Sequence, residues 1–119
     1  MVLTHSEPSA DQAFLDSGQY THEAILKYEL VYGANFVSPG GKRCTDGLIG
    51  RLGLKPGSRV LDVGCGLGGS AFLMKQKFGL KVDAIDLSDN MLKFAQLRLT
   101  EAGLTGQVHC TTRTVWILT

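Results

Sequence analysis

The fold of this chain is decided by residues 60–69, which read Val-Leu-Asp-Val-Gly-Cys-Gly-Leu-Gly-Gly. The apolar residues Val60, Leu61 and Val63 suit a strand that is covered on both faces of a parallel sheet. The glycines that follow allow a tight turn in which the backbone approaches a ligand closely. The stretch therefore predicts a buried strand, a glycine turn and the first residues of a helix.

The residues after the turn continue a strand–helix–strand unit. Residues 70–78 predict a helix that Gly79 ends, and residues 81–86 predict a second strand. Asp86 follows the glycine turn by about 20 residues, the spacing at which a carboxylate meets the ribose diol of a bound nucleoside. The pattern predicts a nucleoside-binding site at this turn.

Asp62 indicates which nucleoside the site was built for. A dinucleotide places its pyrophosphate at the helix N-terminus, where the carboxylate of Asp62 would repel it. S-adenosylmethionine has no phosphate and carries a sulfonium and an ammonium, which a carboxylate attracts. The run resembles motif I of the class I methyltransferases, with Gly64 and Gly66 in the turn and Asp86 at the acidic end of the second strand. A dinucleotide site and a loop that binds nothing are the weaker alternatives.

This resemblance implies an α/β fold with a Rossmann-like parallel sheet. A helix at residues 89–102, capped by Ser88, and a third strand at residues 107–112 continue the alternation. A complete class I methyltransferase has seven strands, whereas this sequence stops after the third. We therefore expect a fold truncated after about three strands, through truncation, alternative splicing or a faulty gene model. Its first strand would be a bare edge with an uncovered apolar face, through which the chain could self-associate.

The chain divides into three expected units. They are a flexible tail at residues 1–10, N-terminal helices forming a substrate and cofactor lid at residues 11–57, and the first half of the cofactor domain at residues 58–119. In the second unit, a short helical turn is expected before Gly18. Thr21 and Gly33 are expected to cap a helix at His22–Tyr32, and a further helix is expected at residues 42–52.

Composition excludes several function classes. The 119 residues carry a formal net charge of +1 with no block of Lys or Arg, which gives no support for nucleic-acid binding. No apolar run approaches the ~20 residues that span a bilayer, and no signal peptide is visible. Cys44, Cys65 and Cys110 lack metal-ligand spacing. We expect free thiols, no metal, a cytosolic location, and no ligand role for the lone His109.

The N-terminal third narrows the family. Residues 14–21, Tyr28-Glu29 and residues 36–41 resemble the segment ahead of motif I in phosphoethanolamine N-methyltransferases. Those enzymes methylate phosphoethanolamine three times to give phosphocholine. The resemblance implies the following roles: Tyr20 acts at the reacting amine, Gln19 and Tyr28 line its pocket, Val37 and Ser38 form a lid over S-adenosylmethionine, and Gly64, Asp86 and Leu87 supply its binding turn, ribose anchor and adenine contact.

The chemistry of amine methylation suits these residue types. An alkylammonium has a pKa near 10, so about one molecule in a thousand is a nucleophile at neutral pH. The enzyme must therefore offer a base or a proton path and align the nitrogen with the methyl group. A tyrosine such as Tyr20 accepts a hydrogen bond from the amine, and its ring face attracts the cation. Without the resemblance, Tyr20 and Tyr28 read equally well as half-buried aromatics.

The sequence departs from the family after the third expected strand. Residues 112–119 contain no carboxylate, whereas the family places an acidic residue there to meet the adenine amino group. The family's histidine partner of the tyrosine and its phosphate-binding residues lie further on. We expect an S-adenosylmethionine-dependent phosphoethanolamine methyltransferase that is inactive as these 119 residues alone. A non-catalytic fragment or interaction module, and a methyltransferase for a sterol or another small amine, remain as alternatives.

Overall fold

The computed structural model describes residues 9–112 of the 119-residue chain. The expected flexible tail falls almost entirely outside the described residues, as does the sequence after the third strand. The elements run in the order α1 (Ala10–Phe14), η1 (Leu15–Gln19), α2 (His22–Tyr32), α3 (Gly41–Leu52), β1 (Arg59–Val63), α4 (Gly69–Phe78), β2 (Lys81–Asp86), α5 (Asp89–Glu101) and β3 (Val108–Thr112).

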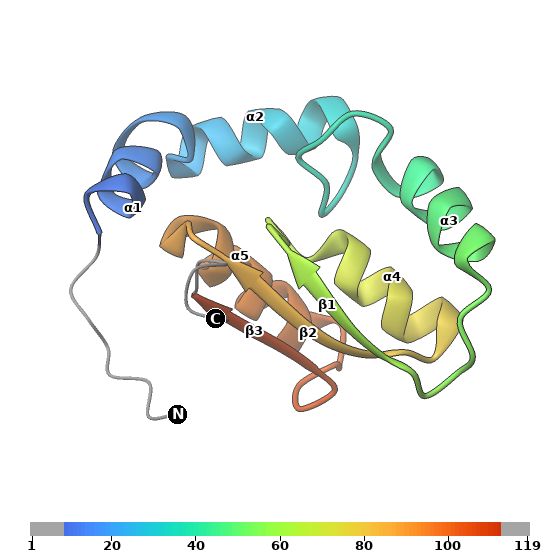
Figure 1. The fold of residues 1–119 in the computed structure, drawn as a ribbon. Coiled ribbons are helices and arrows are strands. Elements are labelled where there is room, and N and C mark those ends of the chain that lie inside the picture. The colour runs from blue at the N-terminus through green and yellow to red at the C-terminus, as the bar shows by residue number, and fades with distance from the viewer. Residues whose placement is uncertain (1–8, 113–119) are drawn as a thin grey trace.

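The strands form one parallel sheet in the order β1-β2-β3. In its register Val60 pairs with Val82, which pairs with Val108. α1 and α2 lie across the end toward which all the strand arrows point (Figure 1). Parallel strands place their carboxyl ends at one edge, and ligands bind at that edge in open α/β sheets. The predicted Rossmann-like α/β fold is confirmed.

The core lies between the sheet and helices α4 and α5. β2 contributes Val82 and Ala84, which are 2% and 0% exposed, because alternate residues of a strand point to the same face. Met91, Ala95 and Leu99 recur every four residues along α5 and form a buried stripe, at most 3% exposed. α5 therefore packs on the sheet and fixes the position of its own N-terminus at the carboxyl edge.

β1 differs from the prediction of a strand covered on both faces. Leu61 and Val63 are 46% and 52% exposed, whereas Val60 packs against the core. Leu61 and Val63 point away from the face on which Val60 lies, and the side chains of that second face remain open to solvent. Within residues 9–112, β1 pairs with β2 alone, so it is an edge strand, as the shortened sheet leads one to expect.

Side-chain caps set the starts of two helices where the sequence places them. Thr21 Oγ1 accepts a hydrogen bond from Ala24 N at 3.2 Å, and Ser88 Oγ accepts one from Met91 N at 3.1 Å. Each bond satisfies an N–H group that has no partner within its helix. Gly33 ends α2 as predicted, with its N–H bonded to Glu29 O.

The short helical turn expected before Gly18 is present as α1, and a second turn that was not predicted follows it. α1 runs directly into the π-helical turn η1, which includes Gly18 and ends at Gln19. Tyr20 N donates to Leu15 O at 2.7 Å and closes this wider turn. The π-helical geometry accommodates the glycine, which has no neighbouring atom within 4 Å of a Cβ built on it.

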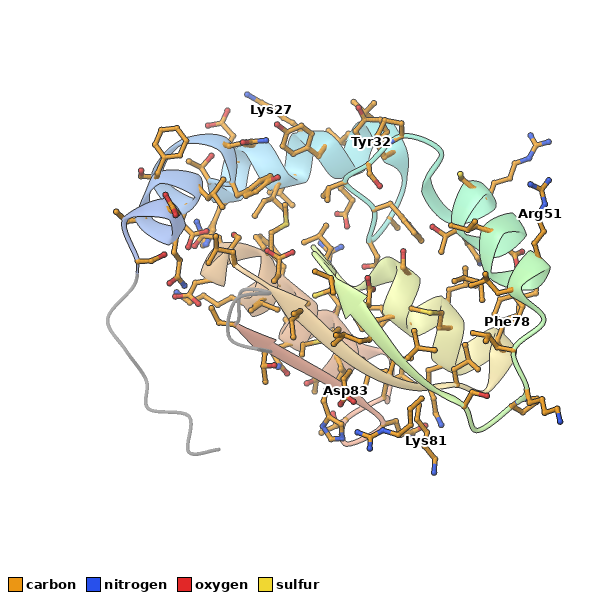
Figure 2. All side chains as sticks on the ribbon, viewed as in Figure 1. Lys27, Tyr32, Arg51, Phe78, Lys81 and Asp83 are labelled. Carbon is orange, nitrogen blue, oxygen red and sulfur yellow. The ribbon has the colours of Figure 1, made fainter. Side chains whose placement is uncertain are left out.

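α3 is attached to the outer side of α4. Thr45 Oγ1 and Ser70 Oγ are 3.4 Å apart, and Lys77 Nζ lies 2.6 Å from an Asp46 carboxylate oxygen. Arg51 and Phe78 lie on this side of the molecule, away from the end where α1 and α2 cross the sheet (Figure 2). α3 therefore supports α4 along its length, from Ser70 beside the glycine turn to Lys77 near its end.

The cysteines are free thiols, as predicted: Cys44 is exposed, while Cys65 and Cys110 are buried. His109 is exposed on β3. Across residues 9–112, no group of acidic, histidine and cysteine side chains is arranged to hold a metal ion. In the same range, no helix has the length and apolar character needed to cross a bilayer.

Candidate functional site

The glycine turn after β1 is held against β2 by its backbone. Gly64 N and Cys65 N both donate to Ile85 O, at 2.8 and 2.9 Å. Gly64 has a φ of +75°, which favours glycine, and a Cβ built on it would meet no atom within 4 Å. The turn therefore presents an open stretch of backbone at the carboxyl edge of the sheet, where a ligand can approach it.

The loop between α2 and α3 lies directly on this turn. Gly69 N donates to Asn35 O at 3.2 Å, and a Cβ on Gly69 would come within 2.5 Å of that oxygen. A Cβ on Gly66 would come within 3.1 Å of Val37 Cγ2. Val37 thus covers the turn, in the place that a lid residue would occupy. Ser38, the other predicted lid residue, is exposed beside it.

Asp62 lies at the end of β1 with one oxygen unsatisfied. Its Oδ2 atom is buried and has no hydrogen-bond partner among the described residues. Burial, followed by the nearby carboxylate of Asp86, raises the pKa of Asp62 above its usual value. A buried carboxylate oxygen without a partner is suited to a cationic group, so Asp62 fits the ammonium or sulfonium that the sequence pattern predicts.

Asp86 ends β2 with its carboxylate turned into the same edge. Oδ2 accepts from Gly66 N at 2.7 Å, and Oδ1 accepts from Ser88 N at 2.9 Å. These bonds hold the carboxylate between the glycine turn and the start of α5. Leu87 follows and is half-buried. The ribose role of Asp86 and the adenine role of Leu87 stay predictions.

Tyr20 reaches this edge from the N-terminal segment. It is half-buried and packs, as Val37 does, on the buried cluster of Ile25, Leu67 and Met91. Its pKa is raised, mainly by burial and then by the carboxylate of Asp86. Leu67 of this cluster belongs to the glycine turn, so the ring lies on the side of the molecule where the turn lies. The structure therefore brings the predicted amine residue and the predicted ribose anchor into one site, although they are 66 positions apart in the sequence.

The two predicted pocket residues beside Tyr20 are also near it. Tyr28 packs edge-on, with ring centroids 6.5 Å apart and planes at 65°. Gln19 Nε2 lies 3.4 Å from the Tyr20 hydroxyl oxygen, to which it donates. Two aromatic rings and an amide at one point of the cofactor edge form a surface that attracts a small cation.

Two clusters that support the site were not predicted from the sequence. One joins Asp16 of η1 to the first residues of α5, including Asn90. The other is a half-buried pairing of Arg98 with Glu29 and Asn35, which holds the lid loop to α5. No local pattern indicates either cluster, because the partners are more than 60 residues apart.

The sequence model of the mycolic acid cyclopropane synthetase family matches residues 40–114, which contain the glycine turn, Asp62 and Asp86. The chain belongs to this family. Its match begins at the end of the lid loop and includes β1 to β3, so it covers the glycine turn and both carboxylates but not Val37 or Ser38. The N-terminal segment that carries Tyr20 precedes the matched region.

Curated relatives match a longer part of the chain than the family model does. Phosphoethanolamine N-methyltransferase 1 of Zea mays is 48% identical over 93 residues, which cover 78% of this chain and 19% of that protein. The Arabidopsis thaliana protein of the same name is 52% identical over 84 residues, covering 71% of this chain and 17% of its own. The predicted resemblance is confirmed. The chain spans about a fifth of the length of these relatives.

Solved structures confirm the class I methyltransferase fold. Phosphoethanolamine N-methyltransferase 2 of Haemonchus contortus, solved with S-adenosyl-L-methionine, superposes with a TM-score of 0.84 at 38% identity. The match covers 89% of this chain and 25% of that one. The same protein in complex with phosphomonomethylethanolamine and S-adenosylhomocysteine gives a TM-score of 0.81 at 40% identity, covering 86% and 24% of the two chains.

Proposed function

We propose that this chain supplies the cofactor site and the amine-binding tyrosine of an S-adenosylmethionine-dependent N-methyltransferase. Its acceptor is phosphoethanolamine or a methylated form of it, on the way to phosphocholine, a phospholipid precursor. One observation carries the proposal: Tyr20 lies at the edge where Asp62, Asp86 and the glycine turn fit the cofactor. The similarity to proteins named for this reaction supports the choice of acceptor.

Each cofactor contact in the proposal has a residue suited to it. Asp62 offers its unsatisfied oxygen to the ammonium of the methionine part, and Asp86 accepts from the ribose hydroxyls. Gly64 leaves room for close approach of the ligand. Val37 and Ser38 close over the turn, and Leu87 contacts the adenine. The domain division into a lid at residues 11–57 and a cofactor half from residue 58 belongs to the same proposal.

When bound, S-adenosylmethionine supplies a methyl group carried on a sulfonium. An amine nitrogen attacks the methyl carbon in line with the carbon–sulfur bond, and the sulfur leaves as a neutral thioether. The protein has to hold the nitrogen and manage its proton. The raised pKa of Tyr20 means that its phenol is protonated at neutral pH, so it acts as a hydrogen-bonding group and not as a phenolate base. The rings of Tyr20 and Tyr28 stabilise the cationic forms of the acceptor through cation–π attraction.

A proton acceptor for the phenol is still required. Among the described residues, the hydroxyl of Tyr20 bonds with Gln19, an amide that takes up no proton. The ring of His22 packs edge-on against Phe94, 5.3 Å away between centroids, and His109 lies on the exposed surface of β3. We infer that the 119 residues alone bind the cofactor without turning over the amine. The free thiols favour work in a reducing compartment, the cytosol.

Calorimetry with S-adenosylmethionine tests the proposal directly. Asp86→Ala should weaken binding about tenfold or more, because two hydrogen bonds to a carboxylate are lost. Asp83→Ala is the matched control, since Asp83 lies on the same strand and pairs with Arg59 on the surface at 3.1 Å. Equal affinities for wild type and Asp86→Ala would refute the cofactor site. The acceptor is tested with labelled cofactor in a protein that also supplies the proton acceptor for Tyr20. Methyl transfer to phosphoethanolamine but not to ethanolamine would support phosphoethanolamine as the acceptor.

A further inference from the structure

The π-helical turn η1, which leads into Tyr20, rests on the N-terminus of α5. Asp16 Oδ2 accepts from Asp89 N at 3.0 Å, and Asp16 Oδ1 accepts from Asn90 N at 3.3 Å. Oδ1 also accepts from Ser88 Oγ at 2.5 Å. The carboxylate therefore satisfies N–H groups that have no partner within α5, and it attaches the start of η1 to that helix.

The side chain of Asn90 attaches the end of the same turn. Its Nδ2 atom donates to Asp16 O at 3.1 Å and to Tyr20 O at 2.8 Å. One amide group thus joins the carbonyls before and after the exposed residues 17–19. Because η1 has no buried residue, these hydrogen bonds and not core packing fix its position.

The same helix start also holds the cofactor carboxylate. Ser88 is fully buried, and its N–H donates to Asp86 Oδ1. Its hydroxyl already caps α5 by accepting from Met91 N, so the helix does not need Asp16 or Asn90 to begin there. Asn90 therefore connects the backbone of Tyr20 to the short segment that places Asp86.

We propose that Asn90 is a positioning residue, which sets the location of Tyr20 relative to the methyl donor through the Tyr20 carbonyl. The inference rests on the proposed function, because it assigns Asn90 to the amine site of that reaction. The rate of methyl transfer depends steeply on the distance between the reacting atoms, and a displacement of about 1 Å lowers it on the order of 100-fold. A tyrosine on an exposed turn needs such an anchor, since its ring is half-buried and its turn has little packing.

Asn90→Ala in the 119-residue chain is the test, with Gln96→Ala as the matched control. Gln96 also lies on α5, and its amide donates to the Cys110 carbonyl at 2.9 Å, away from η1. Asn90→Ala should speed amide hydrogen exchange of residues 18–20 about tenfold or more. It should also lower the NMR-measured pKa of Tyr20 toward its ordinary value of 10.0, because the phenol leaves the buried site beside Asp86. Gln96→Ala should change neither quantity.

Asn90→Asp keeps the shape of the side chain and the favourable negative charge at a helix start, but it cannot donate to the Tyr20 carbonyl. It should reproduce the faster exchange with α5 intact, and it serves if Asn90→Ala fails to fold. The Tyr20 pKa is compared in Asn90→Ala alone, because a new carboxylate beside the phenol raises its pKa by itself. Unchanged exchange in either folded variant, or an unchanged Tyr20 pKa in folded Asn90→Ala, would overturn the proposal. So would equal effects from Gln96→Ala. Wild-type chain that does not bind S-adenosylmethionine would refute the proposed function instead, and exchange and titration would still decide whether Asn90 anchors Tyr20.

Discussion

Asp62 and Asp86 place two carboxylates at one edge of the sheet, and the protein satisfies them unequally. Asp86 receives two backbone hydrogen bonds, whereas Asp62 keeps an unpartnered buried oxygen. A buried polar atom without a partner destabilises a folded chain by about 1–3 kcal/mol. Such a cost is typical of a site that a ligand completes. Asp62 therefore lowers the stability of the ligand-free chain and strengthens cofactor binding.

Asp62→Asn should therefore stabilise the ligand-free chain and weaken cofactor binding. The folded-state pKa of Asp62 is raised, so at pH values between the unfolded and the folded pKa the folded chain holds a proton that the unfolded chain has lost. Wild-type stability then falls as the pH rises from the ordinary value of 3.8 through the raised pKa. Asp62→Asn lacks this loss, so its advantage in melting temperature should grow across that window. Calorimetry should show at least about tenfold weaker binding of S-adenosylmethionine at neutral pH. Equal affinity would contradict the role of Asp62.

The sequence reveals only some residues of this site, for a physical reason. Asp62, Gly66 and Asp86 belong to one continuous strand–turn–helix–strand unit, so their spacing alone predicts that they meet. Asn90 and Asp16 meet across 74 positions, and neither residue type nor spacing indicates that contact. Tyr20 was predicted through a family resemblance and not through its chemistry, because a half-buried tyrosine has many ordinary uses.

At the scale of elements, the boundaries were predictable where a residue terminates the structure by its own chemistry. Thr21 and Ser88 accept from N–H groups at helix starts, and Gly79 ends α4 in the left-handed conformation. The π-helical turn after α1 was not predictable from Gly18, because a glycine is also typical of a helix end or a loop. The exposure of Leu61 was expected from the shortened sheet and not from its apolar run, since the cover of a strand depends on elements elsewhere in the fold.

The lid loop depends on α5 through Arg98, which leads to a prediction about that helix. Arg98 Nη2 donates to Glu29 Oε1 at 3.0 Å, and Nη1 donates to Glu29 and, at 2.9 Å, to Asn35 Oδ1. Arg98→Ala leaves the half-buried Glu29 carboxylate without its cation and should destabilise the chain by about 2 kcal/mol. Because Asn35 O holds the glycine turn, cofactor affinity should fall as well. Chemical denaturation and calorimetry measure the two effects.

Arg98→Lys separates charge from geometry in that experiment. A lysine keeps the positive charge but cannot bond to both Glu29 and Asn35 with a planar fork, so it should rescue only part of the loss. Lys27→Ala is the control, because the Lys27–Glu23 pair is on the surface, with 70% and 79% of the side chains exposed. It should leave both stability and affinity unchanged. Arg98→Ala with wild-type affinity would show that the lid does not depend on this pairing.

At the scale of the whole molecule, one face of the sheet is covered and the other is not. α4 and α5 bury Val82 and Ala84 on the first face, while Leu61 and Val63 are about half exposed on the second. β1 also leaves one row of backbone groups unpaired within residues 9–112. An apolar strand surface beside a free edge favours pairing with another chain.

We therefore expect the 119-residue chain to self-associate through β1. Sedimentation should show a mean mass that rises with protein concentration. Leu61→Lys combined with Val63→Lys should shift the chain toward monomer, because charges on this face oppose close pairing. Leu30→Lys is the control, since Leu30 is 87% exposed on α2, away from the sheet edge, and circular dichroism would verify the fold of each variant. If Leu30→Lys disperses the chain and the β1 variant does not, association runs through α2 and the free edge is protected by its own twist. A chain that stays monomeric throughout would show that the exposed face of β1 is too small to bind a second copy.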